Sequence, residues 1–164
     1  MAALWKLPVL YIIENNKYGM GTSVARASAH TDLFNRGSAY GIPGEEVDGM
    51  NVVTVNAAAA KAIEHIRAGK GPYILEMSTY RYRGHSMSDP AKYRSKEEVQ
   101  KMRSERDPID NVRAMLLDMK DVTEESLKEI DKEVKAIVSD AADFAQQSPE
   151  PDISELWTDI LVEA

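Results

Sequence analysis

The chain has 164 residues, 43% of them apolar and 29% charged, which suits a soluble globular protein and is enough for one domain with a core. Its net charge of −7 argues against nucleic acid as a partner, since phosphate binding needs an excess of Lys and Arg, and no apolar run approaches the ~18 residues of a membrane span. The sequence contains no cysteine, which excludes disulfide bonds, thiolate-bound metals and thiol catalysis.

Residues 1–94 are predicted to form part of an α/β domain with a parallel sheet. The run Val-Leu-Tyr-Ile-Ile at 9–13 is typical of a strand that is buried on both faces. Residues 19–49 and 78–94 have no clear period and are rich in glycine or polar residues. Segments of this length inside a compact domain are usually functional or contain short helices.

A βαβ unit is predicted in the second half of this region. Strands are expected at 51–55 and 73–77, with a helix at 57–68 between them that Asn56 caps. Two parallel strands joined in this way require a right-handed crossover. The apolar stripe of the helix is expected to face the sheet and consists of Ala59, Ile63 and Ile66.

Residues 95–164 are predicted to be helical almost throughout. Ser-Lys-Glu-Glu at 95–98 has the capping-box pattern, and Asp-Pro at 107–108 suits the start of a second helix. A long helix is expected from Thr123 to the Ser-Pro-Glu-Pro break at 148–151, with a short final helix after it. Apolar side chains recur every three or four residues, so we expect them to pack as core, with this region against the α/β domain.

Two adjacent asparagines follow the first predicted strand, at the end of the sheet where open α/β folds bind ligands. Asn15 and Asn16 supply amide oxygens, and the glycine-rich segment 17–23 can turn backbone carbonyls toward the same point. Neutral oxygens suit magnesium, which takes few protein ligands and completes its shell with waters and substrate phosphates. On the residues alone, the simpler interpretation is favoured, in which the asparagines only shape a turn.

Arg81, Arg83 and His85 recur with a period of two, so an extended chain would direct all three to one side. Such donors could bind a diphosphate or a carboxylate, and His85 could exchange a proton near neutral pH. A solvated loop in which Asp89 pairs with the arginines explains these residues equally well. The remaining histidines are expected to be exposed or structural: His30 and His65.

Two motifs carry a family resemblance: Glu-Asn-Asn-Lys-Tyr-Gly-Met-Gly-Thr-Ser at 14–23 and Tyr-Arg-Tyr-Arg-Gly-His-Ser-Met-Ser-Asp-Pro at 80–90. Gly-x-x-Val-Asp-Gly-Met-Asn at 44–51 and Gly-Lys-Gly-Pro at 69–72 fit the same pattern in the same order. Together they resemble the alpha subunits of thiamine-diphosphate-dependent 2-oxo acid dehydrogenases, and most closely those of pyruvate dehydrogenases. The resemblance covers essentially the whole chain as the C-terminal part of such a subunit, and implies part of a thiamine-diphosphate-binding fold at 1–94 with a helical region at 95–164.

The resemblance implies a cofactor site. The family's thiamine-diphosphate motif closes with Asn-Asn, and its last asparagine corresponds to Asn16. The Asn16 side chain and the backbone carbonyl of Tyr18 are then the expected magnesium ligands. His85 corresponds to a histidine that reaches the cofactor's diphosphate end and the substrate channel, which makes it the catalytic candidate.

The resemblance also implies a mobile loop. Arg81, Ser86 and Asp89 correspond to a loop that orders over the site, so we expect residues 81–94 to be disordered without cofactor. Ser23 and Ser86 match positions that are phosphorylated in the mitochondrial enzymes, where added negative charge blocks this ordering.

The family motif opens with Gly-Asp-Gly, which this sequence lacks. We therefore expect the chain to be a fragment that lacks the aspartate ligand. Thiamine diphosphate and magnesium should be unbound in it, because the missing negative charge supplies much of the attraction for the ion. The fragment alone is then expected to be inactive. The loop at 89–94 is one residue shorter than its mitochondrial counterpart, which favours a bacterial source and a cytoplasmic location over the mitochondrial matrix.

The whole enzyme implied by the resemblance decarboxylates pyruvate oxidatively and passes the acetyl group to a lipoyl arm, leading to acetyl-CoA. Its implied partners are a pyruvate dehydrogenase beta subunit, within a heterotetramer, and a dihydrolipoyl acetyltransferase core. One alternative is an alpha subunit that acts on branched-chain 2-oxo acids or acetoin. Another is a non-catalytic module whose helical tail binds a partner.

Overall fold

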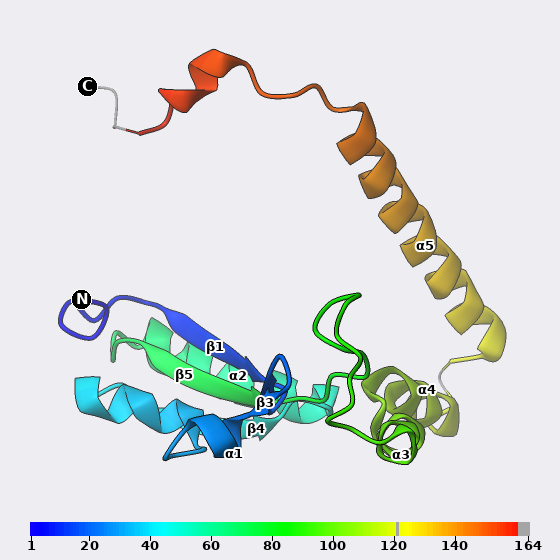
Figure 1. Ribbon diagram of the computed structural model, residues 1–164, viewed down its shortest axis with the longest axis horizontal. Helices are drawn as coiled ribbons and strands as arrows, with labels where there is room; N and C mark the ends of the chain where they lie inside the picture. The colour runs from blue at the N-terminus through cyan, green and yellow to red at the C-terminus, as the bar shows by residue number, and fades with distance from the viewer. Residues whose placement is uncertain (121, 161–164) are drawn as a thin grey trace. The chain divides into compact units, whose positions relative to one another are not determined.

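The computed structural model describes residues 1–120 and 122–160 (Figure 1). The chain forms two compact units, Met1–Met115 and Leu116–Ala164. The first unit contains the β-strands and helix α2, and the second contains the long helix α5. None of the helices within the described ranges is long and apolar enough to cross a membrane.

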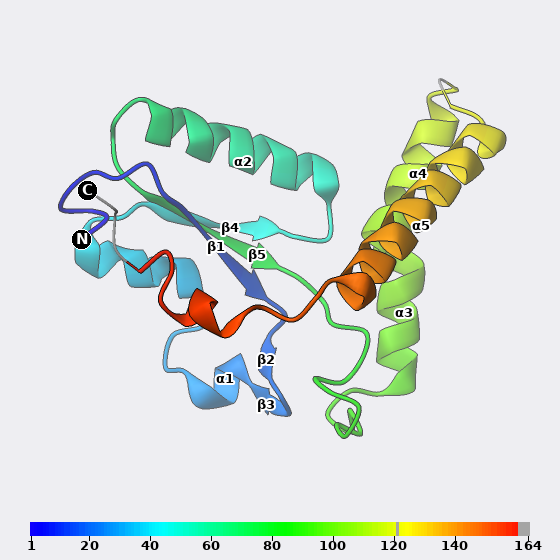
Figure 2. The ribbon, with the colours of Figure 1, turned by 90° about the horizontal axis from the view of Figure 1, so that it is seen from above.

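A three-stranded parallel sheet forms the centre of the first unit (Figures 1 and 2). Its strands lie in the order β1 (Leu10–Asn15), β5 (Tyr73–Ser78) and β4 (Gly44–Asp48), so β5 is the middle strand. Strand β4, helix α2 (Val52–Arg67) and strand β5 form a βαβ unit, as the sequence predicts, although its first strand is not the predicted one. The prediction of an α/β fold with a parallel sheet is therefore confirmed.

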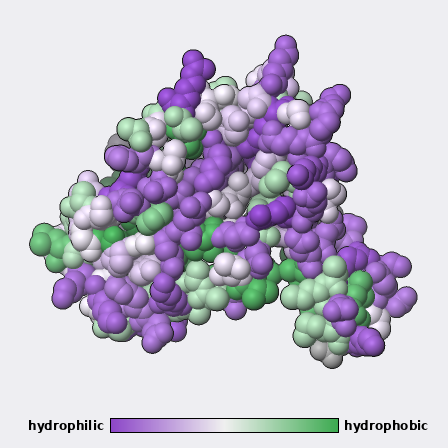
Figure 3. All heavy atoms as spheres, turned by 90° about the horizontal axis from the view of Figure 1, so that it is seen from below, coloured by the Kyte–Doolittle hydropathy of each residue, from purple (hydrophilic) through white to green (hydrophobic). Residues whose placement is uncertain are grey.

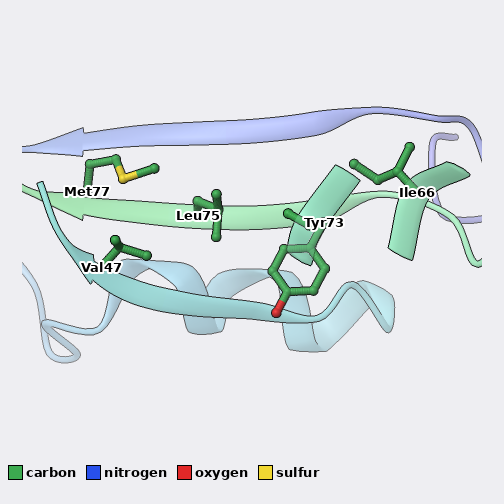
Figure 4. Packing of buried hydrophobic residues seen from close by; sticks show 6 residues of the cluster. Val47, Ile66, Tyr73, Leu75 and Met77 are labelled. Atoms are coloured by element: carbon green, nitrogen blue, oxygen red, sulfur yellow. The ribbon is translucent and has the colours of Figure 1, made fainter. Parts of the chain in front are cut away.

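Helix α2 packs on one face of this sheet and forms the core with it (Figure 4). Alternate residues of β5 point toward the helix, and among them Leu75 is fully buried. Burying an apolar side chain of this size contributes about 1.5–3 kcal/mol to stability. The buried cluster consists of Val47, Ala62, Ile66, Tyr73, Leu75 and Met77.

The strand predicted at 51–55 is wrong, because these residues begin helix α2. Asn51, and not Asn56, is the N-cap, and its side-chain oxygen accepts the N–H groups of Val53 (3.0 Å) and Thr54 (3.2 Å). The cap satisfies two N–H groups that a helix leaves without partners, and it outweighs the β preference of the Val-Val-Thr-Val run. The true strand before the helix is β4, which has only one buried apolar side chain.

Two predictions of burial also need correction. On α2 the buried residues are Ala62 and Ile66, whereas Ile63 is 38% exposed, because the face that docks on the sheet is rotated slightly from the predicted stripe. On β1, expected to be buried on both faces, Tyr11 is 43% and Ile12 58% exposed. The reason is that helix α2 and the 3-10 helix η1 (Leu33–Tyr40), which cover the two faces of the sheet, pack mainly on β4 and β5 and leave the edge strand β1 largely uncovered.

The segment at 19–49 contains short elements that its sequence does not reveal. The 3-10 helix η1 packs against β4 and β5 on the face opposite α2. There Gly37 is buried, and a Cβ at this position would come within 2.8 Å of the backbone carbonyl oxygen of Ile42, which cannot move away as a side chain can, so glycine is required. These elements are β2 (Tyr18–Gly19), β3 (Thr22–Ser23), α1 (Val24–Ala27) and η1 (Leu33–Tyr40).

The predicted starts of the later helices are confirmed. The Ser95 hydroxyl accepts the N–H of Glu98 at 3.0 Å, and the Asp107 carboxylate accepts that of Ile109 at 2.9 Å. Thr123 forms a full capping box with its third helical residue. The elements that follow these caps are α3 (Lys96–Arg106), α4 (Pro108–Asp118) and α5 (Glu124–Gln147), and η2 (Ile153–Leu156) comes last.

The apolar stripe of α5 is exposed in the structure, although its spacing predicts core packing. Ile137 is 69% and Phe144 75% exposed, and none of the residues of this helix is buried. Apolar side chains also reach the surface in patches on the face drawn in Figure 3 (green). The expected packing of residues 95–164 on the α/β domain stays a prediction.

Candidate functional site

The candidate site lies where the three parallel strands end. Strand β1 ends at Asn15, β5 at Ser78 and β4 at Asp48, and parallel strands end at the same edge of their sheet. The carbonyl of Asn15 accepts the N–H of Thr79 at 2.9 Å, which holds the ends of β1 and β5 together. The turn after β1 therefore projects beyond the edge where open α/β sheets bind ligands.

This turn is shaped by its two asparagines. The Asn15 side-chain oxygen accepts the N–H of Lys17 at 2.9 Å, and that of Asn16 accepts the N–H of Tyr18 at 3.2 Å. Lys17 between them has a φ of 68°, in the left-handed region. The turn-forming interpretation of the asparagines is thus observed, and the Asn16 oxygen has a second lone pair for another partner. Metal binding by Asn16 and Tyr18 stays a prediction.

The loop after β5 closes onto this turn through its last residue, Arg94. The Arg94 guanidinium donates to the carbonyl of Asn16 at 2.9 Å and also to the carbonyl of Arg81. It lies over the ring of Tyr80 at 4.3 Å and over that of Tyr18 at 4.6 Å. The stacked pair Tyr18 and Tyr93, with ring centroids 4.8 Å apart, adds a second contact between loop and turn.

Three of the residues predicted from the sequence meet in this loop. Arg81 donates to the carbonyl of Met20 at 3.0 Å and approaches the His85 ring, with 3.4 Å between nitrogen atoms. Asp89 accepts the backbone N–H of His85 at 2.7 Å. Arg81 and Asp89 are joined through the Tyr93 hydroxyl, which lies 2.9 Å from the arginine and 2.7 Å from the carboxylate.

Other predicted residues lie outside this cluster. Arg83 is exposed because the chain bends at 82–83 and does not stay extended, so the expected common side for three donors holds only for Arg81 and His85. Ser86 is exposed, with its hydroxyl 2.9 Å from that of Ser88. Ser23 is the N-cap of α1. The other two histidines are also outside the cluster. His30 is exposed, and His65 is half-buried with its ring edge-on to that of Tyr73.

The loop's hydrogen bonds fix the charge states of two groups. The backbone N–H of His85, and then the hydroxyl of Tyr93, lower the pKa of Asp89 to about 2, so this carboxylate is ionised at neutral pH. Burial, and then its hydrogen bond to the Glu98 carboxylate, raises the pKa of Tyr80 to about 12. Asp89 is thus an acceptor and Tyr80 a donor across the physiological range.

Sequence reasoning missed two residues that hold the site together. Glu76, fully buried in the middle strand, accepts from the Asn15 side chain at 2.5 Å. A single acid inside an otherwise apolar strand was the available signal. Arg94 gave no such signal, because its partners come from distant parts of the chain.

The donors at this edge fit a magnesium ion that keeps part of its shell for phosphate and water. An amide oxygen of Asn16 and a backbone carbonyl at Tyr18 are neutral, hard oxygens. Within residues 1–120 and 122–160, no group of three or more His, Cys, Asp or Glu side chains could hold a metal. The Asn16 amide and the Tyr18 carbonyl bring no negative charge themselves, and the oxygens of a diphosphate could supply it.

A parallel sheet flanked by helices, with a polar turn at its carboxyl edge, defines an α/β protein, the class of fold in which ligands bind beyond the strand ends. The family model of the dehydrogenase E1 component matches residues 1–154, and the chain belongs to this family.

Among the relatives are pyruvate dehydrogenase E1 component alpha subunits. The one from Rhizobium meliloti is 70% identical over 162 residues, which are 99% of this chain and 47% of the relative. That from Zymomonas mobilis is 56% identical over 99% of this chain and 46% of its own length. The somatic, mitochondrial form from Bos taurus is 52% identical over 95% of this chain and 40% of its own length. The chain thus spans about half the length of the curated relatives that it matches.

Proposed function

We propose that this chain supplies the Asn16–Tyr18 turn that binds magnesium in the thiamine-diphosphate site of a pyruvate dehydrogenase alpha subunit. The dehydrogenase E1 component family depends in general on thiamine diphosphate. The observation that carries the proposal is the contact between Arg94 and the Asn16 carbonyl, which places the loop over the turn. A loop held in this way can cover a ligand bound at the strand ends.

Each residue of the site has a proposed role. The Asn16 amide oxygen and the Tyr18 carbonyl hold the ion that carries the diphosphate. When bound, thiamine diphosphate supplies the electron sink that allows a 2-oxo acid to lose carbon dioxide. His85 is placed by the hydrogen bond from its backbone N–H to Asp89, and its ring is the proposed catalytic group of this loop. Arg81, Ser86 and Asp89 belong to the segment that excludes water when it closes.

We expect the order of residues 81–94 to depend on the bound cofactor. The loop is held to the turn by hydrogen bonds and ring contacts of Arg81, Tyr93 and Arg94. A diphosphate at the turn would add negative charge beside the two arginines and strengthen this closure. Phosphate on Ser86 would add negative charge within the same loop and compete with that closure.

The wider setting follows from the named relatives. Alpha subunits of pyruvate dehydrogenase are in general part of a multienzyme complex with a beta subunit. The proposed substrate is therefore pyruvate, with acetyl transfer to a dihydrolipoyl acetyltransferase core, and the proposed compartment is the bacterial cytoplasm, or the mitochondrial matrix in a eukaryote. The names of the relatives favour pyruvate over branched-chain 2-oxo acids or acetoin, and an enzyme subunit over a purely partner-binding module.

The test uses an alpha subunit of the relatives' full length that carries this sequence, assembled with a beta subunit. Calorimetry measures thiamine diphosphate binding at a series of Mg²⁺ concentrations for the wild type, Asn16→Ala and the exposed control Asn35→Ala. Asn16→Ala should weaken the Mg²⁺-dependent binding of thiamine diphosphate by at least about 10-fold. Loss of an outer-shell partner of a metal ligand already has an effect of about this size, and Asn16 is proposed to be a ligand itself. Unchanged binding in Asn16→Ala would contradict the proposed function.

Two further measurements separate the parts of the proposal. Decarboxylation of pyruvate, compared with that of a branched-chain 2-oxo acid by the same assembled enzyme, tests the substrate. Calorimetry on the 164-residue chain alone tests whether two neutral ligands suffice, and we expect weak binding because Asn16 and Tyr18 bring no negative charge.

A further inference from the structure

The buried carboxylate of Glu76 contacts the turn through Asn15, but the proposed function assigns it no part in binding magnesium. Its side chain is fully buried in the middle strand β5, and both of its oxygens are occupied. Oε1 accepts the side-chain N–H of Asn15 at 2.5 Å, and Oε2 accepts the backbone N–H of Phe34 at 2.9 Å. A buried acid is costly unless hydrogen bonds compensate it, so its presence in an apolar strand requires an explanation.

The register of the sheet explains how Glu76 reaches the turn. Asn15 pairs with Ser78, and Glu76 lies two residues before Ser78, on the same face. Asn15 and Glu76 are therefore diagonal neighbours across the two strands. This face is opposite the one that packs on α2, and the 3-10 helix η1 covers it.

The direction of these hydrogen bonds fixes the Asn15 amide. Its nitrogen donates to Glu76, so its oxygen faces Lys17 and accepts that residue's N–H at 2.9 Å. A rotated amide would place its NH₂ group against the Lys17 N–H, where two donors would meet. The buried carboxylate thus sets the orientation of a side chain that in turn shapes the turn.

Lys17 is the residue whose conformation depends on this chain of bonds. Its φ of 68° is unfavourable for a residue with a Cβ and needs support from its surroundings. Lys17 lies between Asn16 and Tyr18, so its left-handed conformation determines how the side chain of one and the carbonyl of the other are directed. An extended Lys17 would change the direction of the Tyr18 carbonyl relative to the Asn16 side chain.

We propose that Glu76 is a positioning residue for the magnesium-binding turn, acting through Asn15 on the backbone of Lys17. This inference rests on the proposed function, because it assumes that the turn binds the ion. Glu76 itself does not touch the ion. Its loss should therefore weaken Mg²⁺ binding and leave the chemistry intact once the ion is bound at saturating concentration.

Three variants of the assembled full-length enzyme test this proposal. Glu76→Gln keeps the size of the side chain but replaces one acceptor by a donor, so either Asn15 or Phe34 loses its partner. Asn15→Asp combined with Glu76→Gln restores all three bonds, since the Gln NH₂ can donate to the Asp while the Asp still accepts the Lys17 N–H. Glu46→Gln is the matched control: Glu46 pairs with Glu76 in register and contacts the Lys17 ammonium, but it is exposed and does not hold the Asn15 amide.

The readouts are thiamine diphosphate binding by calorimetry as a function of Mg²⁺, and kcat at saturating Mg²⁺. Glu76→Gln should raise the Mg²⁺ concentration for half-maximal binding by about 10-fold. This is the lower end of the cost of removing a group bonded directly to a metal ligand, because Glu76 acts one step further away, through Asn15. Its kcat at saturating Mg²⁺ should be close to that of the wild type. The double variant and Glu46→Gln should bind like the wild type.

Each other result has a definite meaning. If Glu76→Gln binds Mg²⁺ normally while Asn16→Ala does not, the positioning role is wrong and the proposed function stands. If Asn16→Ala binds normally, both proposals fail. Should Glu76→Gln not assemble, the double variant decides: wild-type Mg²⁺ dependence supports the proposal, and weak binding by an assembled double variant overturns it.

Discussion

The guanidinium of Arg94 donates a hydrogen bond of 2.9 Å to the backbone carbonyl of Asn16, which lies 78 positions earlier in the chain. The same guanidinium lies over the ring of Tyr80 at 4.3 Å and that of Tyr18 at 4.6 Å. The end of the polar loop and the turn after the first strand therefore behave as one structural unit. A change in either should be detectable in the other.

Replacing Arg94 should release the loop. Arg94→Ala removes a hydrogen bond from a charged donor and partly buried cation–π contacts, so we expect the open state of residues 81–94 to gain about 2 kcal/mol, or roughly 30-fold in population. Hydrogen exchange measured by mass spectrometry should show faster exchange in 81–94 and also in the turn at 16–20. The exposed Arg83→Ala is the control, and equal exchange in both variants would show that Arg94 does not hold the loop.

When the loop is closed, a fall in pH should loosen it only in strong acid. The pKa of Asp89 is lowered to about 2, first by the His85 N–H and then by the Tyr93 hydroxyl. Because the folded-state pKa lies below the unfolded value of about 3.9, this contribution to stability is complete above about pH 4 and disappears as the pH falls toward 2. The carboxyl ¹³C shift of Asp89 and the His85 amide shift should titrate together with a midpoint near 2. A midpoint near 4 would mean that these bonds do not persist in solution.

Two substitutions of Lys17 should separate backbone strain from charge. Both Lys17→Gly and Lys17→Val remove the exposed ion pair with Glu46, which is worth at most about 1 kcal/mol. Glycine accepts the φ of 68° without strain, while valine should cost about 1–2 kcal/mol there. Urea unfolding followed by circular dichroism should therefore find the valine variant clearly less stable than the glycine variant. Equal stabilities would indicate that the left-handed turn does not form.

The start of helix α2 can be tested with two asparagines. Asn51→Ala removes the cap that accepts two backbone N–H groups and should destabilise the chain by about 1 kcal/mol. Asn56→Ala lies inside the helix and should be neutral or stabilising by up to about 0.5 kcal/mol, because alanine is the better helix former. Thermal unfolding should place the midpoint of Asn51→Ala below that of the wild type and the midpoint of Asn56→Ala at or above it. A larger loss for Asn56→Ala would support the strand predicted at 51–55.

The sequence predicts those parts of the fold that depend on local signals. The caps at Ser95, Asp107 and Thr123 are polar side chains that satisfy N–H groups a few residues away, so their effect can be inferred from spacing. Strand β4 could not be predicted in this way, because its Gly-Glu-Glu-Val-Asp sequence has one buried apolar residue and its acids find partners in other elements. The β-branched run after Asn51 was misleading because the cap and the docking of Ala62 and Ile66 on the sheet decide its conformation.

In the candidate site, too, local contacts could be predicted from the sequence and long-range contacts could not. The turn formed by Asn15 and Asn16 follows from residues two positions apart, and the structure contains both bonds. The clustering of Arg81 with Arg83 fails because it assumes an extended chain, which bends at 82–83. The part played by Arg94 depends on a partner 78 positions away, and contacts at that separation leave no local pattern.

The most direct measurement of the central claim is a crystal structure of the assembled full-length enzyme with thiamine diphosphate and Mn²⁺ in place of Mg²⁺. Anomalous scattering would locate the ion without reference to the protein. We expect a peak at about 2.1 Å from both the Asn16 side-chain oxygen and the Tyr18 carbonyl, with diphosphate oxygens completing the shell. A peak bound by other residues, with Asn16 turned toward solvent, would contradict it.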